Sequence, residues 1–191
     1  MTVDEIFADV GTHMVKGLML HEELANYYDF LGLKGYMKCH EYHYLLESWN
    51  LRKLNTYYIK HYGKLIPNVK VDTEEIVPTS WYRYEQVDVD TNTKRNAIKS
   101  AIEKWLNWET ETKRVYQRSY LELIELGEVG TAVDLFINLI KDVDDELIHI
   151  RKINLNKKST GYEICSIESE QHDKYCKYKE KIEHIGEQYK S

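Results

Sequence analysis

Two side chains in the segment DDELIHI, Glu146 and His149, have the types and the spacing of metal ligands. Residues three apart on a helix project from one face about one turn apart, so this carboxylate and imidazole can reach a single ion. The same spacing is common on helices that face solvent. The motif therefore predicts a metal site only if further ligands face it from neighbouring elements.

Further ligand types gather on one face of an earlier segment. His40, His43 and Glu47 are separated by three, four and seven residues, and these steps return to the same side of a helix. Two imidazoles and a carboxylate suit iron, manganese or zinc. Histidines at the edge of a core also commonly donate hydrogen bonds to tyrosines or carbonyl groups, so this set has a second, purely structural interpretation.

Glu109 occupies a position at which the periodic pattern expects a core residue. It lies between Trp105 and Thr112 on one helical stripe. An unpaired carboxylate in that place would cost several kcal/mol unless a cation or a proton compensates it. We therefore expect Glu109 to be a ligand.

The first helical segment offers neighbouring acidic residues in LHEELANYY. Glu22 lies nearer the apolar stripe through Leu18 and Ala25, whereas Glu23 better matches the position of the other candidate ligands along the axis of a helical bundle. His21 is a third option. We rank Glu22 slightly ahead and leave the choice open.

These residues can meet only if the helices that carry them pack together. Apolar residues recur at three- and four-residue steps in four long stretches, which is the pattern of amphipathic helices. Glycines separate the first stretch from the second and the third from the fourth, and both prolines fall between the second and the third. We expect helices over about residues 3–31, 37–65, 91–126 and 131–153, a long connection over residues 67–90, and a charged C-terminal helix over about residues 162–189.

The positions of the candidate ligands along the bundle axis depend on whether the long connection spans the length of the bundle. At 1.5 Å per residue, Glu23 and His43 both lie ~15 Å from the turn between the first two helices. Glu109, Glu146 and His149 lie ~27 to 32 Å from the turn between the last two. If the connection spans the bundle, the turns lie at opposite ends and all these residues reach one height; a short link would separate the two halves by ~12 Å or more. The polar residues therefore favour a four-helix bundle with a long crossover between its second and third helices.

Composition limits the function and the location. The chain has 191 residues and a net charge of −6, with acidic and basic residues interleaved, which argues against nucleic-acid binding. Few prolines and glycines favour an all-α protein, and three cysteines without framework spacing favour a reducing compartment. No signal peptide or membrane-spanning stretch is evident. We expect a cytoplasmic protein with one bundle domain over residues 1–156, a helical extension over residues 157–191, and no membrane partner.

Three short segments resemble the ferritin-like superfamily of carboxylate-bridged iron proteins. These are HEELANYY, WETETKRVY, in which Glu109 precedes Tyr116 by seven residues, and DDELIHI, which resembles the second E-x-x-H motif of the superfamily. LANYYDFLGLKG and TAVDLFINLIKDVDDELIHIRK are also similar to the mini-ferritins (Dps proteins). At the first E-x-x-H, this sequence has ESWN, with Asn50 in place of histidine, and His40 or His43 is the alternative ligand.

The resemblance implies a ferroxidase-type oxidoreductase that assembles as a homo-oligomer. It would bind ferrous iron through carboxylates and histidines, with a di-iron centre as one form and manganese or zinc as alternative metals, and would oxidise or store the iron. Two alternatives stay open. One is a metal-free helical-bundle oligomer or adaptor, which Asn50 favours. The other is a di-metal oxidase with an organic substrate, which would need an apolar pocket beside the metals.

Overall fold

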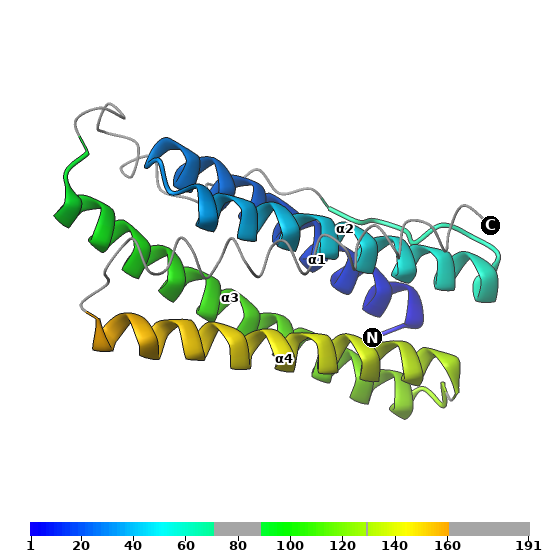
Figure 1. Ribbon diagram of the computed structural model, residues 1–191. Coiled ribbons are helices and arrows are strands. Elements are labelled where there is room, and N and C mark those ends of the chain that lie inside the picture. Colours follow the sequence, from blue (N-terminus) through cyan, green and yellow to red (C-terminus); the bar gives the residue numbers. More distant parts are fainter. Residues whose placement is uncertain (71–88, 129, 161–191) are drawn as a thin grey trace, which may run out of the picture.

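Helices make up nearly all of the chain that the computed structural model describes, which is residues 1–70, 89–128 and 130–160. No strand occurs in these ranges, and the prediction of an all-α protein is confirmed. Most of the predicted connection over residues 67–90, and the predicted C-terminal helix over residues 162–189, lie outside them. The four helices are α1 (Val3–Phe30), α2 (Lys34–Tyr62), α3 (Thr91–Glu125) and α4 (Thr131–Ser159) (Figure 1).

Local sequence signals set the helix ends. The Thr2 hydroxyl accepts a hydrogen bond from the Glu5 amide, while the Glu5 carboxylate accepts one from the Thr2 amide, and this capping box starts α1. Gly63 ends α2 because its backbone is left-handed, with a φ of 66°, which glycine adopts without steric cost. The helix therefore stops at Tyr62, earlier than the predicted end near Leu65.

The helices pack chiefly as two antiparallel pairs, α1 with α2 and α3 with α4, and α1 also packs against α3. Figure 1 shows the turn between α1 and α2 at one end of the bundle and the turn between α3 and α4 at the other. The end of α2 and the start of α3 consequently lie at opposite ends. The fourth helix continues to Ser159, past the predicted domain boundary at residue 156. None of the four helices is both long and apolar enough to cross a membrane.

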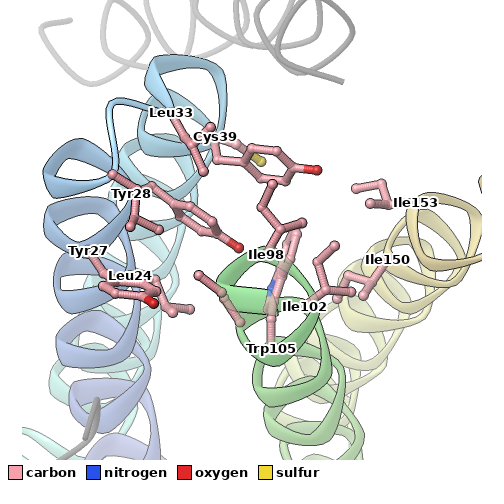
Figure 2. Packing of buried hydrophobic residues seen from close by; sticks show 14 of the residues in the cluster. Leu24, Tyr27, Tyr28, Leu33, Cys39, Ile98, Ile102, Trp105, Ile150 and Ile153 are labelled. Carbon is pink, nitrogen blue, oxygen red and sulfur yellow. The ribbon is translucent and has the colours of Figure 1, made fainter. Parts of the chain in front are cut away.

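The buried apolar side chains form two clusters along the bundle, and polar side chains lie between them. Figure 2 shows the first cluster, which includes Trp105 of α3, and Cys39 of α2 also belongs to it. The second includes Val115 of α3 and Leu54 of α2. The middle of the core is therefore polar. On α3 the buried polar residues between the two clusters are Glu109 and Thr112, and on α2 they are His40, His43, Glu47 and Asn50.

Gly17 of α1 lies at the same level of the bundle as these buried polar side chains. A Cβ atom added to Gly17 would lie 3.4 Å from the Trp108 Nε1 and 3.7 Å from the Glu47 Cδ, which are ordinary contact distances. Replacing Gly17 by alanine is therefore expected to raise the free energy of unfolding by about 1 kcal/mol, through the higher helix propensity of alanine.

Urea unfolding of the two proteins measures this difference. Gly11→Ala on the same helix is the matched control. There the added Cβ would lie only 3.1 Å from the Val69 Cγ2, so a smaller gain or a loss is expected. A larger gain at Gly11 than at Gly17 would contradict this account of the packing.

Candidate metal centre

Three side chains from three helices bring potential ligand atoms together inside the bundle. His21 of α1, His43 of α2 and Glu146 of α4 each place one nitrogen or oxygen atom within 4.8 Å of the other two. The His43 Nδ1 and the Glu146 Oε1 are 2.9 Å apart, and these side chains are only 7% and 9% exposed. Trp105 of α3 donates its indole N–H to the same Glu146 oxygen over 3.1 Å. Two imidazoles and a carboxylate form a donor set that suits first-row divalent metals.

His21 also contacts polar side chains on two other helices. Its Nδ1 lies 3.0 Å from the Nδ1 of His40, so one ring donates a hydrogen bond to the other. Its Nε2 lies 3.6 Å from the Oε1 of Glu109. The His40 ring stacks on Tyr28, with centroids 5.3 Å apart, and meets the Trp105 ring with centroids 4.8 Å apart. Packing therefore fixes His40, and His40 in turn orients His21.

Burial and neighbouring charges separate the protonation states of these groups. Burial, reinforced by His43, lowers the pKa of His21 to about 3. Burial also lowers the pKa of His40 well below its usual value. Burial opposes charge on His43 as well, but the Glu146 carboxylate raises its pKa well above the usual value, and His43 lowers the pKa of Glu146 against the effect of burial. His43 and Glu146 therefore form a buried ion pair, whereas His21 and His40 are neutral imidazoles.

Two further carboxyl groups, those of Glu109 and Glu47, are buried at this level of the bundle. Burial and the Glu146 charge raise the pKa of Glu109 well above its usual range, and the same causes raise the pKa of Glu47 to about 8. Within the described residues, neither oxygen of Glu109 has a hydrogen-bond partner, and the same holds for the Glu47 Oε2, the Asn50 Oδ1 and the Tyr116 hydroxyl. Each unmet polar atom in a protein interior costs about 1–3 kcal/mol. This group of buried polar atoms is thus a costly arrangement.

The structure brings most of the predicted ligands to this centre, but from α1 it brings His21 and neither Glu22 nor Glu23. Glu22 is exposed and Glu23 is half-buried, whereas His21, the third option, is fully buried. The buried stripe of α1 includes Gly17, His21 and Leu24, so Glu22 points about 100° away from it. Of the predicted ligands, this centre contains His40, His43, Glu47, Glu109 and Glu146. His149 lies beside the Trp105 ring. Metal binding by any of these residues stays a prediction.

The polar role of Trp105 was not predicted from the sequence. The periodic pattern places this residue on the core stripe, yet its indole N–H donates a hydrogen bond to Glu146. Its ring also lies against His40 and His43, with centroids 4.8 Å from each. The position of Trp105 on the core stripe, one turn before Glu109, could have indicated this role, because a buried indole N–H needs a hydrogen-bond acceptor.

One more histidine, His13 of α1, lies beside the centre without belonging to it. Its ring stacks on Trp108, with centroids 4.4 Å apart and an interplanar angle of 2°. Its Nε2 lies 2.7 Å from the Thr112 Oγ1, and the Thr112 hydroxyl donates to the Trp108 carbonyl over 3.0 Å. Because the hydroxyl proton is used there, His13 donates through Nε2.

We expect His13 to destabilise the fold in acid. Burial lowers its pKa from 6.5 to about 4; Glu111 opposes this effect, and Lys16 and Arg118 add to it. Since the folded pKa lies below the unfolded value, the unfolded state binds the proton first, and stability falls as the pH falls from 6.5 towards 4. Between pH 6.5 and about pH 5 this residue should cost about 2 kcal/mol.

Urea unfolding at these two pH values, for the wild type and His13→Gln, isolates this contribution. Glutamine keeps an N–H donor for Thr112 but does not titrate. The variant should lose about 2 kcal/mol less than the wild type on acidification. Equal losses would show that His13 is not held neutral.

The centre therefore offers neutral imidazole nitrogens and carboxyl oxygens from all four helices in a largely buried interior. A neutral imidazole can bind a metal ion directly, whereas a protonated imidazole or carboxyl group must first give up its proton to solvent. Comparisons of the chain with protein-family models, with curated proteins and with solved structures gave no match.

Proposed function

We propose that this chain is an iron-binding protein of the ferritin-like type that binds ferrous iron at the polar centre of its bundle and oxidises or stores it. The observation that carries the proposal is Glu109. Its side chain is fully buried, neither of its oxygens has a hydrogen-bond partner among the described residues, and its Oε1 lies 3.6 Å from the His21 Nε2. A cation would satisfy both groups at once.

The surrounding donors support a transition metal over a hard ion such as Mg²⁺. His21 and His43 supply nitrogen ligands, and Glu146 supplies a charged oxygen ligand. Imidazoles suit iron and zinc, whereas magnesium and calcium prefer sites made of oxygen alone. Manganese and zinc are the alternative metals for the same donors.

The arrangement of the helices supports the ferritin-like part of the proposal. The two turns lie at opposite ends of the bundle, and this places residues from the first helix pair level with residues from the second (Figure 1). In such a bundle, bound ferrous iron would supply one-electron chemistry towards dioxygen or peroxide. The residues bind the substrate ion: carboxylates favour the ferric state, and His40 and Trp105 hold the ligands in place.

The test is metal content and iron oxidation on one preparation. We expect purified protein, loaded anaerobically with ferrous iron, to retain iron after desalting and to oxidise it faster than buffer when air is admitted. Light scattering on the same sample measures the predicted homo-oligomer. Glu22→Gln, an exposed change next to His21, is the control and should match the wild type. Loss of all iron on desalting, with oxidation at the buffer rate, would favour the metal-free bundle oligomer or adaptor.

A further inference from the structure

We propose that this centre binds a single metal ion per chain, at a histidine-rich position formed by His21, His43 and Glu146, and not the pair of carboxylate-bridged ions that the ferritin-like resemblance implies. The inference rests on the proposed function, because it requires a metal at this level of the bundle. It specifies the number of ions and the ligands that bind them.

The spacing of the three ligand atoms fits one ion. Donor atoms that share an ion with bonds of about 2.0–2.2 Å lie roughly 3–4 Å apart. The chosen atoms of His21, His43 and Glu146 already lie within 4.8 Å of one another, so shifts of about 1 Å would place them around one ion. The ion would replace the proton between the His43 Nδ1 and the Glu146 Oε1, which would leave to solvent.

Neighbouring side chains support this position. The Nδ1 of His21 is engaged by His40, which leaves the His21 Nε2 for the ion. Trp105 holds Glu146 through its indole N–H. Glu109, with its Oε1 3.6 Å from the His21 Nε2, is placed to supply a fourth ligand. Two imidazoles and a carboxylate form the donor set of mononuclear zinc and non-haem iron sites.

Among the described residues, a second position at the level of Glu47 lacks the ligands that a bridged second ion needs. At the height of Glu47, α1 carries Gly17, which has no side chain, and the Trp108 indole packs against it. Asn50 follows Glu47 by one turn, so this level receives an amide from α2 instead of an imidazole. His13 does not replace it, because its ring stacks on Trp108 and its Nε2 is bound to Thr112. A bridged pair of ions would therefore be short of a nitrogen ligand and of an α1 ligand.

Cobalt(II) is the probe for the test, because its visible absorption reports both binding and ligand type. Anaerobic titration of the full-length protein, followed by calorimetry and by metal analysis after desalting, should give one Co²⁺ per chain. Ferrous iron should compete for the same site. His21→Ala should weaken Co²⁺ binding by about 100-fold, whereas Glu47→Gln should change it by less than about tenfold and keep the stoichiometry at one. Glu22→Gln is the matched exposed control on α1.

The outcomes separate the two proposals. Two Co²⁺ ions per wild-type chain, or loss of all binding in Glu47→Gln, would overturn the single-ion site and leave the proposed function standing. No binding of Co²⁺ or Fe²⁺ by the wild type would overturn both. The wild-type stoichiometry needs no variant, so a failure of His21→Ala to fold, seen by circular dichroism, does not remove the test.

Discussion

Replacing Glu146 by alanine is expected to lower the free energy of unfolding of the metal-free protein by about 3–5 kcal/mol. Glu146 pairs with His43 over 2.9 Å, and both side chains are less than a tenth exposed. Removing the carboxylate leaves a buried imidazolium with no counterion, and it also leaves the Trp105 indole N–H without its acceptor. Without Glu146, burial is the largest influence on His43 and lowers its pKa, while the Cys39 side chain raises it by less, so His43 is expected to lose its proton when the variant folds.

The pH dependence of this loss identifies the ion pair. The pKa of His43 is raised on folding, so its contribution is complete below the unfolded value of 6.5 and disappears as the pH rises through the folded value. The pKa of Glu146 is lowered, so its contribution is complete above 4.5 and disappears as the pH falls through its folded value. The cost of Glu146→Ala should therefore be greatest between about pH 4.5 and pH 6.5 and smaller in alkali.

Urea unfolding at pH 5.5 and in alkali, with metal chelated, is the measurement. Asp145→Ala, the exposed neighbouring residue on α4, is the control and should change stability little at either pH. A loss below about 1 kcal/mol in Glu146→Ala at both pH values would mean that His43 and Glu146 are not an ion pair in solution.

The helices and the level of the site could be predicted from the sequence because both follow from regular geometry. A period of 3.6 residues marks the four helices, and a rise of 1.5 Å per residue places Glu109 and Glu146 at one height. The end of α2 could not be placed as well. An apolar pattern continues past Tyr62 to Leu65, but the left-handed backbone of Gly63 stops the helix first.

The candidate ligand from α1 could not be chosen from the sequence for a related reason. The buried stripe of this helix includes Gly17 and His21, and neither is apolar, so an apolar pattern does not find it. The stripe was drawn instead through Leu18, which is only half-buried, and this displaced the expected ligand to Glu22. A stripe that is interrupted by glycine and histidine at helical spacing is itself a signal of a polar level in the core.

Glu109 could be predicted as a candidate site residue because a carboxylate at a core position conflicts with the apolar periodicity of the residues around it. That conflict predicts a trade-off between stability and metal binding. Within the described residues, both Glu109 oxygens lack hydrogen-bond partners, and burial and the Glu146 charge raise the pKa of Glu109, so the carboxyl is neutral in the metal-free protein. Its removal therefore breaks no ion pair.

Replacing Glu109 by methionine, which has a similar size, is expected to raise the free energy of unfolding of the metal-free protein by about 1–3 kcal/mol. The same change should weaken Co²⁺ or Fe²⁺ binding by about 100-fold, because the ion loses an oxygen ligand or the group that orients His21. The stability gain should grow as the pH rises above 4.5, since the unfolded carboxyl ionises there while the folded one keeps its proton. Urea unfolding with chelator and Co²⁺ titration measure the two effects, and Glu103→Met, an exposed change on α3, should produce neither. A residue kept only for packing would do the opposite: Glu109→Met would then lower stability and leave metal binding unchanged.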